Sequence, residues 1–499
     1  MSRRCRVHAA LPARGAGRGH HPDVLLLPPR GRALTEPASA TPSPGPAGSA
    51  VTESSPRPRP GPRRLVLLAA AGAVVLAALV TGVLLLVRGG SSASDAAAAT
   101  VPVALTAPGA PAGTTIGVVV TLGSDESQGA GWNRAAQGAA VAAHRFGLGG
   151  TDVTLLTLDD QGTVEGGRAA VQRLVDRGAS GVVLATSGDH VQGALEASAA
   201  AGVPVVMPYA DGEAAGADVW STAPDEEQVA EALADALGGA ERPLLVDAGG
   251  SVPAALPTAG SLAFRPGDDV TSLGQEVARL TGAAPAAPED QTQGEAGGAT
   301  FDAVVVAGPP TQQAVVVQAL QAADVTARVV LTPEATSPAF AGALQERGGA
   351  VSSELVTVGA DWDDAVALRQ DAAGRAMSAF LGAVRLLAEE PAATNLTEDV
   401  PFAEVAGAAD SRSHDAVVAL VRAVAAAEST DPGKVADALG GLRLSARDGV
   451  AGPALDLTRR AVLDGEVRPL HASAQDLGLR PAAQDGTVRT VWFPAPVAQ

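Results

Sequence analysis

The chain has 499 residues, of which 46% are hydrophobic and 18% charged, with one Cys and a formal net charge of −19. This length suits two or three domains, and the single Cys excludes both a disulfide framework and a Cys-based metal site. Residues 1–88 hold 12 Arg and 3 acidic residues, whereas residues 89–499 hold 23 basic and 51 acidic side chains. Because this acidic part repels phosphate, nucleic acid is an unfavourable partner.

An N-terminal transmembrane helix is predicted at Leu65–Val87, an apolar run of 23 residues. At about 1.5 Å per residue it is about 34 Å long, enough to cross a bilayer. Arg residues flank mainly its N-terminal side, which predicts a single-pass cell-membrane protein whose C-terminal domain is extracellular. We expect a disordered cytoplasmic tail at 1–63, the membrane helix at 64–88 and a flexible linker at 89–113. A cleaved signal peptide is the alternative. A lipid-anchored form is excluded, because no Cys follows the apolar run.

After residue 113, short apolar runs recur without polar alternation, as in strands buried on both faces of a parallel sheet. The predicted strands are Ile116–Val120, Val153–Leu158, Gly181–Ala185, Val203–Met207, Leu244–Val246, Ala303–Ala307, Val329–Leu331 and Leu355–Val358. Stretches with helical periodicity separate them. The predicted helices are Trp132–Phe146, Thr163–Arg177, Val191–Ala201, Asp225–Leu237, Thr311–Ala323 and His414–Glu428. This alternation of strands and helices predicts an α/β doubly wound architecture.

Several of these segments, in their order, resemble a known family. They include "IGVVVTLGSDESQGAGWNRAAQGAAVAA", "LTLDDQGTVEGGRAAVQRLVDRGASGVVLATSG", "AGVPVVMPYAD" and "SRSHDAVVALVRAVAAAESTDPGKVADALGGL". Over roughly residues 114–480 the chain resembles the type 1 periplasmic-binding-protein fold, in the branch of the leucine/isoleucine/valine-binding proteins of ABC importers. The resemblance implies two doubly wound parallel-sheet lobes that close on a small solute. It places lobe 1 at 114–222 plus 359–445, and lobe 2 at 223–358 plus 446–499.

Ligands of such sheets bind outside the carboxyl ends of the strands. The loops there supply the predicted ligand-binding residues, which are Ser124, Ser187, Gly188, Asp189, Tyr209, Ala210, Asp211 and Glu334. In the family, two hydroxyls receive the ligand's carboxylate, and by the resemblance they fall at Gly188 and Asp211, neither of which is a hydroxyl. Ser187, next to Gly188, could substitute. Glu334 matches the acid that receives the ligand's ammonium group. The resemblance therefore implies a site that keeps the residue for the ammonium group and lacks part of the residues for the carboxylate.

Three interpretations of this site stay open. The first is a solute receptor, with an ABC permease as partner, for an amino-acid-like or other small polar or amine-bearing solute. The second is a ligand-poor sensory or partner-binding ectodomain of the same fold. The third is that Asp189, Asp211 and Glu334 are solvated loop acids, with Tyr209 in plain packing and Ser187 a helix cap.

Enzyme signatures are lacking in the sequence. None of the seven His has metal-ligand spacing, and the nucleophile-elbow and P-loop motifs are absent. His190 beside Asp189 is expected to cap a helix start rather than act as a base. We therefore expect a binding protein without enzyme activity, cofactor or metal.

Overall fold

The computed structural model describes residues 102–123, 129–210, 216, 218–283, 300–482 and 489–494, all within one unit of the chain, Ser94–Gln499. The predicted tail, the membrane helix at Leu65–Val87 and the first half of the linker lie outside the described residues, as do Ser124 and Asp211. Within the described part of the chain, no helix combines the length and apolarity that a membrane span requires.

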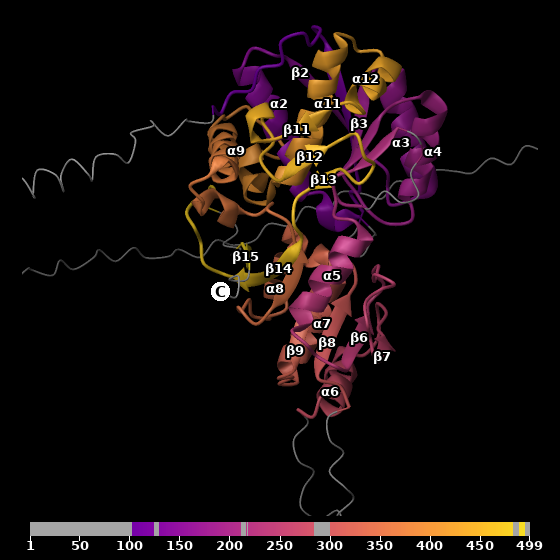
Figure 1. The fold of residues 1–499 in the computed structure, drawn as a ribbon, viewed down its shortest axis with the longest axis vertical. Helices are drawn as coiled ribbons and strands as arrows, with labels where there is room; N and C mark the ends of the chain where they lie inside the picture. The colour runs from indigo at the N-terminus through magenta and orange to yellow at the C-terminus, as the bar shows by residue number, and fades with distance from the viewer. Residues whose placement is uncertain are drawn as a thin grey trace, which may run out of the picture. The chain divides into compact units, whose positions relative to one another are not determined.

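The first sheet contains five parallel strands in the order β2-β1-β3-β4-β5. Their bounds are β1 Thr114–Val120, β2 Val153–Asp159, β3 Gly181–Leu184, β4 Val205–Met207 and β5 Val219–Ser221. The helices beside it are α2 Gly138–Leu148, α3 Val164–Asp176, α4 Val191–Ala201, α11 Ser411–Ala427 and α12 Pro432–Leu439 (Figure 1). Alternate residues of β1 enter opposite cores: Ile116 and Val118 pack with α2 and α11, whereas Val119 packs with α3 and α4. Burial on both faces explains why these strands lack polar alternation.

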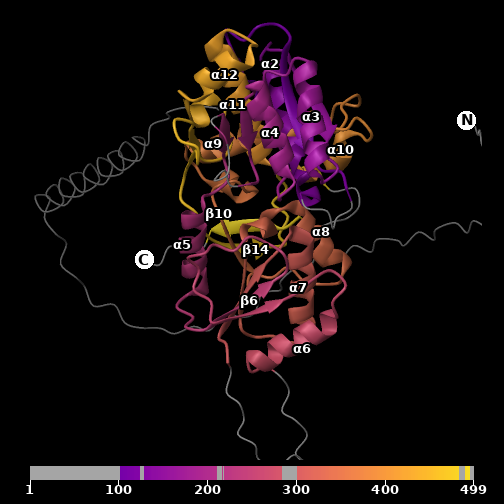
Figure 2. The ribbon, with the colours of Figure 1, turned by 90° about the vertical axis from the view of Figure 1, so that its right-hand side faces the viewer.

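The second sheet contains seven strands in the order β15-β14-β10-β9-β8-β6-β7. Their bounds are β6 Pro243–Asp247, β7 Gly260–Ala263, β8 Ala303–Ala307, β9 Arg328–Leu331, β10 Val356–Gly359, β14 Arg468–Ser473 and β15 Val491–Pro494. Helix α5 (Glu226–Leu237) covers one face, and α6 (Val270–Leu280), α7 (Pro310–Ala322) and α8 (Pro338–Glu346) cover the other (Figure 2). The parallel strands confirm the predicted doubly wound α/β fold, but β14 and β15 pair antiparallel at one edge, which the strand pattern did not predict.

The chain passes between the two sheets after β5, after β10 and after a small antiparallel sheet. This small sheet consists of β11 (Arg443–Leu444), β12 (Ala454–Asp456) and β13 (Leu463–Asp464). Leu455 and Val462 are buried in the core of the first sheet, although they fall in the range predicted for lobe 2. The lobe boundaries given above remain a prediction, and these contacts place this hairpin with the first lobe.

Helix α9 (Ala372–Ala388) and the short α10 (Phe402–Val405) follow the second passage between the sheets. The sequence analysis did not predict either helix. Met377, Phe380 and Phe402 are fully buried in a separate cluster that also includes Val141 of α2. This cluster attaches α9 and α10 to the first lobe.

Residues 102–113 are packed, which differs from the predicted linker at 89–113. Leu105 is only 5% exposed, and its backbone N–H donates to the Arg145 carbonyl of α2. The Arg145 guanidinium in turn donates to the Val103 carbonyl at 2.8 Å. A Cβ on Gly449 would lie 2.6 Å from Leu105 Cδ2, so only a glycine at this position leaves room for the Leu105 side chain. These contacts make the second half of the predicted linker part of the folded domain.

Candidate functional site

The carboxyl edge of the first sheet brings together two of the predicted residues through Trp132. Ser187 follows β3 and Tyr209 follows β4. Trp132, in the 3₁₀ turn η2 (Ala130–Trp132), donates from Nε1 to Ser187 Oγ at 3.1 Å. Its ring stacks on the Tyr209 ring, with centroids 4.4 Å apart and planes 7° apart. The sequence analysis treated Trp132 only as the start of a helix, so this central side chain was missed.

Tyr209 is tied to the start of α11 by a buried hydrogen bond. Its hydroxyl donates to Asp410 Oδ1 at 3.0 Å. Burial, together with the Asp410 charge, raises the pKa of Tyr209 well above its ordinary value, so the phenol stays protonated and remains a donor. Asp410 Oδ1 also accepts from the backbone N–H of Ser413 at 3.0 Å and caps α11.

Arg412 extends this group of aromatic and charged side chains. Its Nε donates to Asp410 Oδ2 at 3.0 Å, and its side chain is 8% exposed. Its guanidinium carbon lies 4.5 Å from the Trp132 ring centroid, 5.1 Å from that of Tyr209 and 5.2 Å from that of Trp362. We call Trp132, Tyr209, Trp362, Asp410 and Arg412 the aromatic–arginine cluster. No local pattern in the sequence marks Arg412, which lies about 200 residues beyond Tyr209.

The second sheet contributes Glu334 and a contact with the first lobe. Glu334 is half-buried in the 3₁₀ turn η4 (Pro333–Thr336), which follows β9. Ser337, directly after η4, caps α8. Its hydroxyl donates to the Gly131 carbonyl of η2 at 2.6 Å. A Cβ on Gly131 would lie 3.0 Å from Pro310 Cγ. The turn that carries Glu334 therefore adjoins the turn that carries Trp132.

The other predicted residues take different roles where the structure describes them. Gly188 has φ of 113°, a backbone conformation that favours glycine. Asp189 is exposed. The Ala210 carbonyl accepts from Ser221 Oγ at 2.7 Å, which holds the loop after β4. Ser124 and Asp211 fall outside the described residues, and the eight-residue set stays a prediction.

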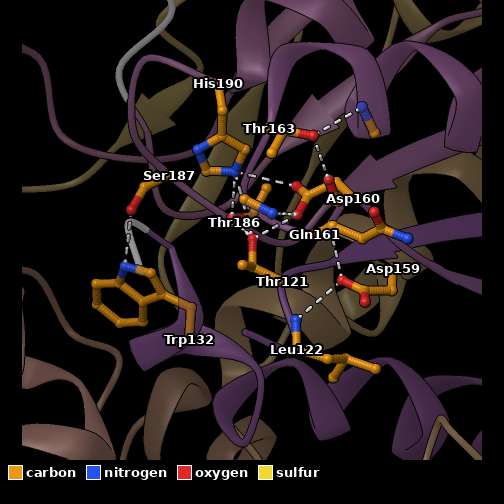
Figure 3. A network of polar contacts seen from close by, with 12 residues as sticks. Thr121, Leu122, Trp132, Asp159, Asp160, Gln161, Thr163, Thr186, Ser187 and His190 are labelled. Atoms are coloured by element: carbon orange, nitrogen blue, oxygen red, sulfur yellow. Dashed lines mark hydrogen bonds and ion pairs between the residues drawn. The ribbon is translucent and has the colours of Figure 1, made fainter. Parts of the chain in front are cut away.

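A buried polar network joins the ends of β1, β2 and β3 (Figure 3). Asp160 accepts from Thr121 Oγ1 at 2.8 Å and lies 3.0 Å from His190 Nε2. Thr121 and Thr186 share a hydrogen bond of 2.7 Å. Asp159 accepts from the backbone N–H of Leu122 and Gln161. The paired aspartates that end β2 thus hold adjacent loops in register.

His190 lies in this network in a way that differs from the expected helix cap. It precedes α4, but its side chain makes no cap hydrogen bond. Its Nε2 faces Asp160 at 3.0 Å and both Thr121 and Thr186 at 3.3 Å. A nucleophilic triad uses opposite ring nitrogens for the acid and the nucleophile. Here one nitrogen faces both, so the geometry suits structure rather than acyl transfer.

A second buried network fixes α2 to α11. Burial lowers the pKa of His414, and its Nδ1 lies 2.7 Å from Asp415 Oδ1 while Nε2 lies 2.9 Å from Arg145 Nη1. Burial also lowers the pKa of Arg145 to about 10, so its guanidinium remains charged near neutral pH. A neutral His414 therefore donates to Asp415 and accepts from Arg145, linking two buried charges.

Two surface cavities are lined by no residue of the aromatic–arginine cluster, although Gly452 in the lining of the second adjoins Trp362. One of about 490 Å³ is lined by Thr106–Ala112 and Gly149–Asp152. The other, of about 290 Å³, is lined by residues that include Asp361, Gly452 and Glu466. Neither touches Ser187, Tyr209 or Glu334. Within the described part of the chain, His, Cys, Asp and Glu side chains form no group that could hold a metal ion.

Comparisons with known proteins agree with this architecture. The chain is similar to a leucine binding protein from Thermotoga maritima MSB8, with 17% identity, a TM-score of 0.52, and 72% of this chain and 95% of that chain covered. It is similar to a type 1 periplasmic binding protein from Bordetella pertussis Tohama I, with 16% identity, a TM-score of 0.53, and 76% and 99% covered. A solute binding protein of an ABC transporter from R. palustris, solved with 4-hydroxybenzoate, gives 14% identity, a TM-score of 0.51, and 77% and 96% covered.

These structural likenesses, at such low identity, establish the fold. No curated protein matches the chain. A family model described as periplasmic binding protein matches residues 113–464, which is well over half of the chain and covers the first sheet and the parallel strands of the second. The chain belongs to the periplasmic binding protein family.

Proposed function

We propose that this protein is an extracellular solute receptor that serves as the substrate-binding component of an ABC importer. The observation that carries the proposal is that loops at the strand ends of the two sheets lie next to each other. Ser187, Trp132 and Tyr209 gather at the carboxyl edge of the first sheet, and the turn that holds Glu334 adjoins them through the Ser337–Gly131 hydrogen bond. Strand ends of two α/β lobes are where such folds bind ligands. The solute is a small polar molecule, amino-acid-like or amine-bearing, with Glu334 facing its cationic group.

The neighbours support this proposal by what they bind. Among the similar structures are a leucine binding protein and one solved with 4-hydroxybenzoate. Both of these ligands are small molecules with a carboxylate. The proposal also includes an ABC permease as partner, and a membrane anchor at Leu65–Val87 that leaves the binding domain outside the cell. Protease treatment of intact cells, which digests the domain and leaves residues 1–63 protected, is the expected result for that topology.

A thermal-shift screen tests the receptor function. A ligand that binds only the folded state stabilises it by mass action, by about 2.7 kcal/mol at a hundredfold excess over Kd. We expect at least one amino acid, amine or small organic acid to raise Tm in a saturable manner. Glu334→Gln should weaken the binding of an amine-bearing ligand, whereas Glu346→Gln, at the end of α8, should not. A broad library that leaves Tm unchanged would reject the receptor function.

A second candidate function is a ligand-poor ectodomain that binds a partner protein. The observation that favours it is the aromatic–arginine cluster, in which the protein's own side chains pack against the carboxyl edge of the first sheet. Arg412 is 8% exposed and Trp132 3% exposed. If this packing is permanent, no solute displaces it, and the thermal-shift screen gives no response.

A further inference from the structure

Arg412 is buried, yet most of its N–H donors have no partner among the residues that the structure describes. A guanidinium carries five N–H donors and no acceptor. Among the described residues, only Nε of Arg412 has a hydrogen-bond partner, Asp410 Oδ2 at 3.0 Å. The four N–H groups on Nη1 and Nη2 have none there, and neither nitrogen is among the fully buried unpaired atoms, so the 8% of the side chain that is exposed includes this edge of the guanidinium. An accessible pair of N–H donors on an otherwise buried guanidinium can bind an anionic group.

Asp410 fixes the orientation of this guanidinium without occupying its outer edge. Its Oδ1 accepts from Tyr209, from the Ser413 backbone at 3.0 Å and from Ser413 Oγ at 2.7 Å. These bonds immobilise the carboxylate, which then holds Nε through Oδ2. Nη1 and Nη2 form the edge of the planar guanidinium that can bind both oxygens of one carboxylate. The pair leaves this edge available.

The aromatic rings form flat walls beside the guanidinium. The Trp132 and Tyr209 centroids are 4.4 Å apart, and the Arg412 carbon is 4.5 Å and 5.1 Å from them. The guanidinium carbon therefore lies within cation–π range of both rings of the stacked pair. The rings attract the cation and form flat apolar walls beside it.

Ser187 adds a hydroxyl donor next to the same tryptophan. Its Oγ accepts from Trp132 Nε1 at 3.1 Å, so its own proton points elsewhere. Ser187 is half-buried at the end of β3. Arg412 and Ser187 thus flank Trp132 with donors, which is the chemistry that a negatively charged group requires.

We propose that Arg412 is the anion anchor of the solute site and that the solute carries a carboxylate, held by Nη1 and Nη2 of Arg412 with help from Ser187. The guanidinium takes over the task for which Gly188 and Asp211 lack hydroxyls. The aromatic walls favour a flat or apolar body on the acid. This inference rests on the proposed receptor function, whose solute it narrows to organic acids, including amino acids.

Binding of matched probes to the full-length chain tests the inference. The probes are benzoate, 4-hydroxybenzoate and leucine as carboxylates, benzamide as the neutral isostere of benzoate, and benzylamine as the cation. Calorimetry gives the affinities. Intrinsic fluorescence reports on the site, because two of the four Trp, Trp132 and Trp362, adjoin Arg412. We expect a carboxylate to bind and its neutral isostere to bind at least tenfold more weakly.

The decisive variant is Arg412→Gln, which should weaken carboxylate binding at least tenfold. Arg460→Gln is the matched control, because Arg460 also lies against a tryptophan, 4.4 Å from the Trp220 ring, outside the cluster. Arg412→Lys keeps the charge without the planar fork and should lose part of the affinity. It also serves if the glutamine variant does not fold.

The failures of the two proposals are distinguishable. If benzylamine or benzamide binds and no carboxylate does, or if Arg412→Gln and Arg412→Lys bind the acid as tightly as the unmodified chain, the anchor is wrong and the receptor function stands. If no probe binds the unmodified chain while Arg412→Gln gains affinity for guanidinium ion, Arg412 is a permanent plug. In that case both the anchor and the receptor function are rejected.

Discussion

Asp364→Asn should strongly destabilise the folded domain, because it removes the partner of a buried arginine. Asp364 lies in the 3₁₀ turn η5 (Asp364–Leu368), after the second passage between the sheets. Its carboxylate accepts from Arg480 Nε at 2.7 Å and from Arg480 Nη2 at 2.8 Å. The two side chains are 4% and 6% exposed. This bidentate pair holds the C-terminal segment against η5.

The pKa of Asp364 gives one measure of this interaction. Burial alone would raise it, but the charges of Arg480 and Arg489 outweigh burial and lower the pKa to about 2, from an ordinary value of 3.8. At about 1.4 kcal/mol per pKa unit, the ionised form is favoured by roughly 2–3 kcal/mol. Removing one partner also leaves the other charge buried, which typically costs about 3–5 kcal/mol. We expect a loss near the upper of these ranges.

Urea denaturation at pH 7 measures this loss, with Asp361→Asn as the control. Asp361 lies three residues away and pairs with Arg468 at 2.9 Å and with Arg369. Because Asp361, Arg468 and Arg369 are 24%, 28% and 43% exposed, its removal should cost about 1 kcal/mol or less. Because folding lowers the Asp364 pKa, its contribution is complete above about pH 4 and is lost as the pH falls through about 2. Equal losses in the two variants would refute this reasoning.

Three further outcomes follow from the same structure. Burial and the neighbouring Asp364 raise the pKa of Asp363 from 3.8 to about 6, although Arg489 opposes them. Asp363→Asn should therefore stabilise the protein by up to roughly 3 kcal/mol at pH 7.5, a gain that should be absent in unfolding measured at about pH 3, below both pKa values. Leu105 is 5% exposed, so Leu105→Ala should lower the free energy of unfolding by about 2–5 kcal/mol in a denaturant titration. Leu148 is 48% exposed, so Leu148→Ala should change it little. If Leu105→Ala leaves the stability unchanged, residues 102–113 belong to the linker and not to the folded domain. His414→Leu should cost about 3–5 kcal/mol, because it leaves the buried Arg145 and Asp415 without their shared partner. Because burial lowers the His414 pKa, the unmodified chain should lose stability as the pH falls below about 6.5 and His414 becomes protonated, whereas the variant should not. Thermal unfolding across pH 5–8 measures both effects.

The alternation of strands and helices was predictable because it depends on local composition. Val191–Ala201 was predicted as a helix with the bounds of α4, and the unbroken apolar runs became strands buried on both faces. Weak elements were missed where no such run exists. The strand β7, for example, alternates half-buried and exposed residues, and β14 and β15 pair only through contacts distant in the sequence. Trp132–Phe146 was predicted as one helix, yet its first half forms the 3₁₀ turns η2 and η3 (Ala135–Gln137).

The doubly wound α/β fold, and the strand ends at which a ligand would be sought, could be predicted from the sequence alone. Periodicity and burial act over a few residues, so each strand and helix carries its own signal. Only the tertiary structure decided which side chains meet at those ends. Tyr209 and Asp410 are 201 residues apart in the chain, and no local pattern couples them. The aromatic–arginine cluster exists because the fold brings the end of β4 and the start of α11 together, and such long-range packing cannot be read from neighbouring residues.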